Sequence, residues 1–500
     1  MSLRRALGAL LGVVVLAGPA TAQVHYHDDG RPWTQRAGGG PDATVPGWFY
    51  RLGLTGLHVR LLADAPTHLR VEHVAAGSPA DGELQVGDVL TGVDGLPFAT
   101  PHRNGYGPLA FGGDGPCQDV ATALERCVSG PVPTGALRLE RRRGDTRANV
   151  TLRIPTRYGA FAPTWPVDCR ASARIRVELL DWLLAQQQSD GSFGGPVQDL
   201  FAPLALLARD SERDRAAVAK NAHFHARTTR AAGDERGLVN WYYTTAGIVL
   251  AEYHLASGAP WVLPELAEVR TFLLRSQYTD PTQIVRGTHA LPTATRTALG
   301  GWGHNPGHEG YGPIQMLIGM ATLALARMRA CGLDVDEARH RLAYDFLARG
   351  TGTNGYVWYA DEVADDAGWA DLGRTGAAAS AWRHSPFADS GHDGLAARAT
   401  ACLREHPQSF PDTHGSPPLG MGFAALAAAA DPAALRALLD ANRWWFTLAH
   451  CGDGTFHYQP NRDNAGYGED ARLVITSVVA FVLSLPDSAL RCAPAARRGK

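Results

Sequence analysis

Lysine is almost absent from this chain of 500 residues: only Lys220 and Lys500 are lysines, and the rest of the 47 basic residues are arginines. An excess of one charge is also missing, since the formal net charge at pH 7 is -2. This balance excludes a globally basic protein that coats nucleic acid. With 45% hydrophobic and 19% charged residues, the chain can bury a large core, and its length suits two or three domains.

Hydrophobic runs long enough to span a bilayer are lacking, and the one apolar stretch at the start is too short for a membrane anchor. Arg4 and Arg5 precede this stretch, which covers residues 6–18, and Ala20-Thr21-Ala22 forms an A-x-A cleavage site. The pattern predicts a secretory signal peptide over residues 1–22, cut before Gln23. We therefore expect an exported protein, periplasmic or extracellular, with no membrane anchor after cleavage.

Cysteines are few and show no metal-like spacing. There are seven, so at least one is unpaired. Cys117 and Cys127 form a local pair only if the helix expected between them excludes one of the two, and buried free thiols are the simpler interpretation. Cys451, Asp453 and His457 carry donors that suit zinc, but they also fit a Gly-Asp-Gly turn. We therefore expect no metal and no cofactor.

Strand signals dominate residues 48–157, after a linker over residues 23–47. Residues 68–74 alternate between apolar and polar, Asp94-Gly95 marks a tight turn, and residues 136–142 and 148–154 predict a closing hairpin. A single helix is expected near residues 119–126. The pattern predicts a small β-rich domain.

Residues 71–95, with a Gly-Ser-Pro-Ala turn followed by Gly-Asp-Val-Leu and a strand ending in Asp-Gly, resemble the centre of a bacterial PDZ domain. The resemblance implies that Arg51-Leu52-Gly53-Leu54 is a loop whose backbone N–H groups bind the carboxylate of a peptide or protein C-terminus. The peptide would add as a strand beside Leu57 to Leu61. Alternatively, the domain serves only as a spacer or docking wall, and the Gly-rich residues 100–116 could cover the groove.

Helical periodicity takes over after a Pro-rich linker at residues 158–170 and continues to residue 488, before a tail at 489–500. The expected helices are 174–188, 199–208, 240–256, 264–276, 313–329, 335–348, 395–405, 419–430, 432–449 and 471–485. Ten to twelve helices joined by Gly-rich turns predict an all-α layered or closed arrangement.

The turns between these helices recur as a glycine followed by an aromatic residue, in residues 188–193, 300–303, 352–356 and 451–456. Such repetition indicates stacked helical hairpins. Gln187 and Gln188 before Asp190-Gly-Ser-Phe193 resemble a junction of α/α-toroids such as terpene cyclases, prenyltransferase subunits and thioester domains. The acidic motif of those cyclases and the Cys-Gly-Glu-Gln run of those thioester proteins are missing, so the resemblance implies the fold and not the reaction.

The whole layout, a PDZ-like domain followed by a toroid, resembles an uncharacterised family of secreted bacterial proteins. The resemblance is carried by residues 247–258, 310–315, 391–394 and 453–459. It implies no known reaction.

Polar and aromatic residues of the expected toroid rim form the candidate site. Toroidal polysaccharide lyases use Asn or Arg to neutralise a uronate carboxylate, and His and Tyr as base and acid. This chain offers those residue types, and we expect His392, beside Asp393, to share a pocket with the loop 302–311. The alternative is that these residues only cap helices and satisfy buried carbonyl groups. The catalytic candidates are His304, His308, Tyr311, Arg374, His392 and Asp393, with Asn240, Trp241, Tyr242 and Glu309 nearby.

Two functions remain open at this point. The first is an exported binding protein, whose PDZ-like domain engages a peptide and whose toroid holds a partner or glycan. The second is a secreted enzyme, a polysaccharide lyase or hydrolase. An enzyme requires an open cleft at the toroid centre where His, Tyr and Arg meet, and a scaffold predicts an apolar plug there.

Overall fold

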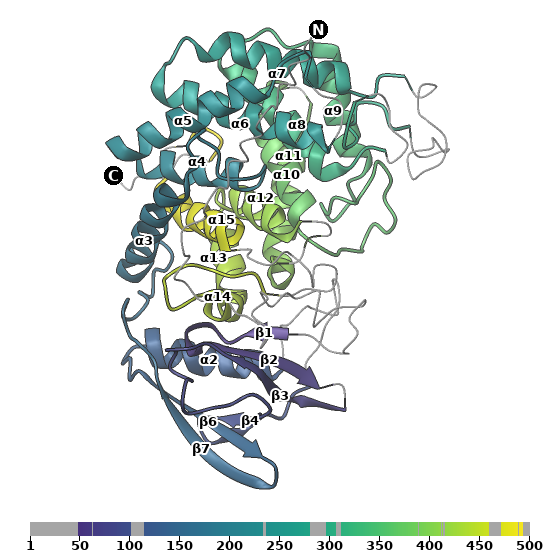
Figure 1. Cartoon of the computed structure of the whole chain (residues 1–500). Helices are drawn as coiled ribbons and strands as arrows, with labels where there is room; N and C mark the ends of the chain where they lie inside the picture. The colour runs from purple at the N-terminus through teal and green to yellow at the C-terminus, as the bar shows by residue number, and fades with distance from the viewer. Residues whose placement is uncertain are drawn as a thin grey trace, which may run out of the picture.

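The computed structural model describes residues 49–62, 64–101, 115–233, 237–280, 297–306, 312–388, 390–411, 413, 416–459, 472–488 and 490–493. Two parts are evident in Figure 1: a sheet region (residues 49–153) at the bottom and a larger helical domain (residues 170–493) above it. The predicted signal peptide and the linker over residues 23–47 lie outside the described residues. Among the helices that are described, none is long and apolar enough to cross a membrane.

In its described residues, the sheet region is one antiparallel sheet with the helix α2 packed on it. Its strands lie in the order β1-β2-β3-β4-β6-β7, and β5 pairs with β4. The predicted Asp-Gly turn is confirmed, because Asp94 and Gly95 both have positive φ between the paired Val93 and Leu96. The elements are β1 (Phe49–Arg51), η1 (Gly53–Thr55), β2 (Leu57–Leu62), β3 (Ala65–Val74), β4 (Val89–Val93), β5 (Leu96–Pro97), α2 (Pro116–Ser129), β6 (Ala136–Arg143) and β7 (Thr146–Arg153).

The helical domain alternates inner and outer helices. The inner ones are α4 (Gln198–Arg209), α6 (Val239–Ser257), α8 (Gln315–Ala330), α10 (Gly373–Arg383), α12 (Pro417–Ala428) and α15 (Arg472–Ser484). The outer ones are α3 (Arg170–Gln186), α5 (Glu212–Thr228), α7 (Val262–Ser276), α9 (Glu337–Arg349), α11 (His392–Glu405) and α13 (Pro432–Ala441). The helix α14 (Arg443–Ala449) and the short η4 (Pro407–Ser409) and η5 (Leu485–Asp487) complete the described helices.

The inner helices form a closed ring. Each packs on the next, from α4 through α6, α8, α10 and α12 to α15, and α15 packs back on α4. Every outer helix contacts the inner helix before or after it. This packing is that of an α/α-toroid, so the predicted fold of the helical domain is confirmed.

Burial explains which helices are inside. Every residue of α12 is buried, and so are Gln315 to Met328 of α8. The outer helices α9 and α11 bury only one stripe each and expose charged residues on the other side. A helix that is buried all round belongs in the interior, and one with a single apolar stripe belongs at the surface.

The repeated glycine turns join the hairpins as expected. Gly300 has φ +90°, and a Cβ there would collide with the carbonyl oxygen of Leu342 in α9. Gly191 approaches Lys220 in α5 in the same way, and Gly355 approaches Arg398 in α11. Glycine is therefore required both by the backbone conformation and by the close approach of the next outer helix. The aromatic residues that follow, Phe193, Trp302, Tyr356 and Phe456, are all buried.

Two helices were not expected from the sequence, and one expected helix is divided. The helix α5 is rich in charged residues, and α10 contains Gly373 and Gly376, which disfavour a helix in isolation. In the ring these glycines let α10 approach α12 at Gly420 and Ala424. The single helix predicted over residues 432–449 is wrong, because Asn442 separates α13 from α14.

The expected tail does not begin at residue 489. Leu490, Cys492 and Ala493 are buried, and the backbone N–H of Arg491 donates to Glu252 at 2.7 Å.

All seven cysteines are free, and Cys117 and Cys127 both lie within α2. The interpretation of buried free thiols therefore holds for all but Cys331, which is half-buried.

Candidate functional site

A cavity of about 320 Å³ opens at one end of the ring, and we call it the N-terminal cavity. Its walls come from the first turns of α6, α8, α10 and α12 and from the residues just before α4. Helix N-termini carry unsatisfied N–H groups and a partial positive charge, so this end of the ring favours an anionic or acceptor-rich ligand. The lining residues are Pro196, Val197, Gly237, Leu238, Trp241, Tyr242, Thr245, His304, Ile314, Met316, Met320, Tyr359, Arg374, Thr413, Ser416 and Leu419.

His304 and Arg374, two of the predicted site residues, both line this cavity. The indole N–H of Trp241 donates to Nδ1 of His304 at 2.9 Å. An indole can only donate, so Nδ1 is the acceptor and the proton of the neutral imidazole is on Nε2. His304 is therefore a hydrogen-bond donor, and the expected role of a base does not suit it in this state.

Arg374 is buried and held in place by three partners. Its Nη1 lies 3.0 Å from Asp371 Oδ2, Nη2 donates to the Tyr356 hydroxyl at 2.9 Å, and Nε donates to Val357 O at 3.4 Å. Burial opposes the charge, but the attraction of Asp371 outweighs it and holds the pKa of Arg374 above its usual value. A guanidinium has five N–H groups, so two remain available beyond these three bonds.

The opening of the cavity carries exposed apolar surface. Leu238 is 51% exposed and Tyr242 is 44% exposed. Leu238 directly precedes α6, and Tyr242 lies on its first turn with Trp241. Leu238 has φ +64°, a left-handed conformation that is unfavourable for a bulky side chain. Backbone strain and exposed apolar side chains at a cavity are both typical of ligand-binding sites.

No Asp or Glu is found among the described residues that line the N-terminal cavity. Hydrolysis of glycosidic bonds usually requires a pair of carboxyl groups on either side of the scissile bond. The described walls offer hydrogen-bond donors and aromatic rings.

His392 does not line this cavity, so the expectation that it shares a pocket with the loop 302–311 is wrong. Its ring stacks on Tyr344 of α9 at 4.4 Å, and Nδ1 lies 2.6 Å from the Ser385 hydroxyl. His392 and Asp393 form the first turn of α11, an outer helix, and the ring of inner helices separates an outer helix from the centre. His308, Glu309 and Tyr311 lie outside the described residues.

Asn240 has a structural role instead of facing a ligand. Its side-chain amide donates to Gly303 O at 2.9 Å, and its backbone N–H donates to His304 O at 3.1 Å. Together these bonds fix the segment that carries His304. Leu238 and Tyr359 are among the lining residues that were missed from the sequence. The aromatic run after Gly355 could have indicated Tyr359, whose ring centre lies 5.4 Å from the Arg374 guanidinium, whereas nothing in the sequence marks Leu238.

Cys451 and Asp453, two of the residues whose donors suit zinc, belong to a turn. The Asp453 carboxylate accepts from the backbone N–H of Thr455 at 3.0 Å and from its hydroxyl at 2.6 Å. Cys451 Sγ donates to Ala449 O. In the described part of the chain, no three His, Cys, Asp or Glu side chains gather in a way that would hold a metal ion.

The segment expected to bind a peptide carboxylate, Arg51 to Leu54, is covered by the helical domain. A Cβ on Gly53 would collide with the carbonyl oxygen of Thr447 in α14, and the backbone N–H of Arg51 donates to Gln459 Oε1 at 3.2 Å. The strand β1 pairs with residues 58–60 of β2, and β3 occupies the other edge. A peptide strand therefore has no open edge beside these residues.

A family model described as a domain of unknown function, DUF6288, matches residues 172–491. The chain belongs to the DUF6288 family. The matched residues run from α3 to the buried C-terminal segment, so the DUF6288 domain coincides with the closed ring and does not include the sheet region.

Solved structures resemble the same part of this DUF6288 protein. An inactive variant of an α-1,6-mannanase of Salegentibacter sp. is 12% identical, with 63% of this chain and 98% of that chain covered and a TM-score of 0.44. A type II terpene cyclase from Scytonema is 13% identical, with coverages of 62% and 96% and a TM-score of 0.41. The cellobiose 2-epimerase from Spirochaeta thermophila is 13% identical, with 63% and 97% covered and a TM-score of 0.41. The comparison with curated proteins finds no match.

Proposed function

We propose that the helical domain is a carbohydrate-active unit that binds an acidic sugar in the N-terminal cavity and cleaves its chain by elimination. The observation that carries this proposal is Arg374, a buried cation with two N–H groups to spare, in a cavity where helix N-termini converge. A uronate carboxylate is the sugar group that matches this environment.

The walls supply the other requirements of an elimination. Arg374 and the Nε2–H of His304 both donate hydrogen bonds, which stabilise the charge that develops on the carboxylate when the neighbouring carbon loses its proton. Tyr242 lies at the opening, and its oxygen, as phenolate, would take that proton from the carbon and pass it to the leaving sugar oxygen, as the C–O bond breaks and the C=C bond forms. The exposed faces of Trp241 and Tyr242 provide apolar surface for a sugar ring.

The test is to incubate the chain from Gln23 onward with polygalacturonate, alginate and a neutral glucan. We expect the ultraviolet absorbance of an unsaturated uronate with the acidic polymers only. Arg374→Lys keeps the charge but loses the planar fork, so turnover should fall about a hundredfold, the scale of a small misplacement at a reaction centre. Arg383→Lys, at the other end of α10, is the matched control and should retain activity.

Two results would contradict the elimination. The first is a release of reducing ends without any unsaturated product, which would indicate hydrolysis. The second is equal activity of Arg374→Lys and the unchanged protein, with circular dichroism showing that both are folded.

We infer that the sheet region, which resembles a PDZ domain in the order of its motifs, serves as a docking wall for α14. The contact of Gly53 with Thr447 and the pairing of β1 with β2 support this role. Peptides with free and with amidated C-termini should then bind equally weakly in a fluorescence-polarisation titration. A selective response to the free carboxylate would instead support a peptide-binding groove.

Export through the predicted signal peptide is also part of this proposal, because polymeric acidic sugars are met outside the cell. Expression of the full chain in a bacterium, followed by fractionation and N-terminal sequencing, should recover an exported form that begins at Gln23. A protein that keeps residues 1–22 and stays in the cytoplasm would contradict it.

A further inference from the structure

Four arginines lie in one row across the sheet region, and we call them the arginine row. Arg60 of β2 lies directly opposite Arg70 of β3, and Arg142 of β6 lies directly opposite Arg147 of β7. Val89 of β4 joins the two pairs, because it is paired with Arg70 on one side and with Arg142 on the other. Residues directly opposite each other in a sheet point to the same face. Neighbouring strands are about 4.8 Å apart, so the row is about 19 Å long.

The alternation of side chains along β6 shows which face of the sheet carries the arginine row. Leu137 and Leu139 are buried in the same core as Leu124 of α2. Successive side chains of a strand point to opposite faces, so Arg138 and Arg142 lie on the face away from α2. The whole row therefore lies on this outer face.

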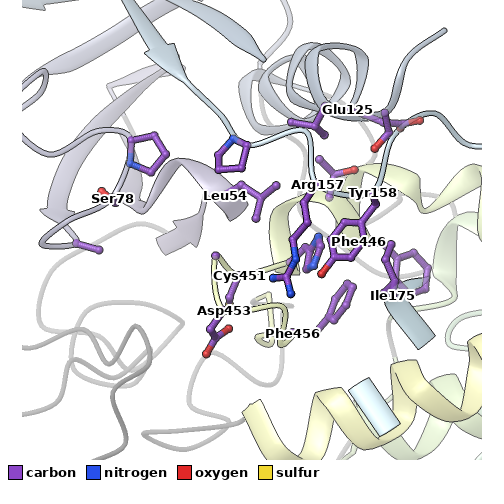
Figure 2. A pocket seen from close by; sticks show the side chains of 18 of the residues that line it. Leu54, Ser78, Glu125, Arg157, Tyr158, Ile175, Phe446, Cys451, Asp453 and Phe456 are labelled. Carbon is purple, nitrogen blue, oxygen red and sulfur yellow. The ribbon is translucent and has the colours of Figure 1, made fainter. Parts of the chain in front are cut away.

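This outer face is turned away from the helical domain. The helix α2 packs both on the strands β3, β4 and β6 and on α14, and Arg443 of α14 pairs with Glu125 of α2. Figure 2 shows Glu125 and Leu54 of the sheet region and Phe446 of α14 around the cavity between the two parts. In Figure 1, β6 and β7 lie at the bottom of the molecule. A large partner can therefore approach the sheet from the side of the arginine row.

Arginines on the two faces of this hairpin differ in their partners. On the side of the core, Arg141 and Arg143 lie 3.8 Å and 2.7 Å from the carboxylate of the buried Asp88. On the outer face, Arg142 and the exposed Arg147 form no ion pair with any residue that the structure describes. The first two arginines stabilise the fold, whereas the charges of Arg142 and Arg147 remain available to a partner.

The arginine row lowers the stability of the sheet. Like charges directly opposite each other on a sheet repel, and the row contains two such pairs. Glu72 offsets the first pair in part, since it lies 2.8 Å from Arg60 and 3.6 Å from Arg70. No described carboxylate offsets the second pair in this way. Residues that break a local rule of folding in this manner are expected at functional positions.

The chemistry of the row indicates a long anion. Guanidinium groups bind carboxylates through two parallel hydrogen bonds, and a row of this length accommodates several anionic groups in succession. Arg138 of β6 and the exposed Arg153 of β7 add positive charge on the same face. The described strands from β3 to β7 contain no Phe, Tyr or Trp, so the aromatic platform on which the bases of a single-stranded nucleic acid stack is missing from them.

We propose that the arginine row binds an acidic polysaccharide, which runs across the strands with its carboxylates on Arg70, Arg142 and Arg147. The choice of a uronate chain among polyanions rests on the proposed function, because that polymer is the one whose carboxylate matches Arg374. The row then holds the polymer at a second place outside the N-terminal cavity. Attachment at one place raises the effective concentration of the same chain at the other.

Biolayer interferometry on immobilised polygalacturonate, with the chain from Gln23 onward, tests the proposal. We expect binding that weakens as sodium chloride is added, because salt screens exposed charges, and no binding to a neutral glucan. Arg142→Gln combined with Arg147→Gln should raise the Kd about fivefold to tenfold, the effect of two surface ion pairs. The melting temperature of this double variant should stay the same or rise, because the repulsion between the two arginines is removed.

The matched control is Arg213→Gln combined with Arg398→Gln, which removes the same charge from exposed positions of α5 and α11. This control should leave the Kd unchanged. The effect of the first double variant should also be the same in the Arg374→Lys background, because sites without shared partners contribute additively. A protein that binds the polymer through the row but forms no unsaturated product would contradict the elimination and leave this proposal intact.

Equal Kd values for the unchanged protein and the folded Arg142→Gln, Arg147→Gln variant would overturn the proposal. An equal loss of affinity in the control would also overturn it, because binding would then follow net charge alone. Stronger binding of a single-stranded DNA oligonucleotide, or of phosphatidylglycerol vesicles, than of polygalacturonate would assign the row to that partner instead.

Discussion

The indole of Trp241 and the imidazole of His304 are joined by one hydrogen bond of 2.9 Å, which fixes the tautomer of the histidine. Trp241 belongs to α6, and His304 lies in the segment before α8. The bond therefore also ties together two neighbouring walls of the N-terminal cavity.

Trp241→Phe should release the tautomer of His304 while keeping an aromatic ring in the wall. Since the only donor to Nδ1 in this pair is lost, the nitrogen chemical shifts of the imidazole should change from a single Nε2–H form to a mixture. Affinity for an acidic sugar should fall about tenfold, the scale of one hydrogen bond. Trp261→Phe, outside the cavity, is the control, and unchanged His304 shifts in Trp241→Phe would contradict the assignment.

The side chain of Leu238 is expected to lower the stability of the fold and to provide apolar surface at the cavity opening. Leu238→Gly removes a left-handed strain of about 1 kcal/mol and should keep or raise the melting temperature, although acidic sugar binding should weaken. Gly237→Ala is the matched control: Gly237 has φ +76° and open space around it, so alanine should lower the stability by about 1 kcal/mol. A marked loss of stability in Leu238→Gly would show that the side chain is needed for packing.

The glycines at the hairpin junctions should tolerate substitution by alanine much less well than glycines of similar φ elsewhere. Gly300→Ala places a methyl group against the backbone of α9, whereas Gly258→Ala, at φ +68°, meets nothing. We expect urea denaturation to show a loss of about 1 kcal/mol for Gly258→Ala and a clearly larger loss for Gly300→Ala, because backbone must move. Equal losses in the two variants would mean that the close approach is not rigid.

Acid should destabilise the protein through buried neutral histidines. Burial lowers the pKa of His384 to about 4, of His450 to about 4 and of His340 to about 3. The unfolded chain, with histidines near pKa 6.5, binds more protons below that pH than the folded chain does. Stability should therefore be fully present above about pH 6.5 and should fall as the pH drops toward 4, by up to about 1.4 kcal/mol per pH unit for each histidine.

Urea titrations from pH 8 to pH 4 measure this effect. His384→Gln should reduce the slope of stability against pH by the contribution of one proton. The imidazole of His384 takes up that proton only in the unfolded chain, and the amide of glutamine does not titrate. A stability that does not depend on pH between 6.5 and 4 would rule out the explanation.

The sequence predicted the hairpin repeats because their signal is local. A glycine needed for the turn at Gly300 is followed within two residues by the buried Trp302, and the same spacing recurs at Gly191 and Phe193. The helix α10 was missed because its Gly and Ala residues make sense only against α12, which comes later in the chain. Packing between helices that are distant in the sequence leaves no local pattern from which α10 could be predicted.

The candidate site was predicted in part. Arg374 and His304 lie in one cavity because each precedes or begins an inner helix, and inner helices share one end of the ring. His392 looked similar in sequence, beside a carboxylate and at the start of a helix, but it begins an outer helix. Without knowing which helices are inner, the sequence could not separate the two cases.

Closure of the ring by α15 against α4 has a consequence for how the chain folds. The first inner helix cannot complete its packing until the last one has been synthesised, so this contact is among the most distant in sequence and forms late. A chain that ends before Arg472 would leave apolar sides of both α4 and α12 uncovered. The sheet region docks on α14, directly before that last helix, so it gains its final position only when nearly the whole chain has been made.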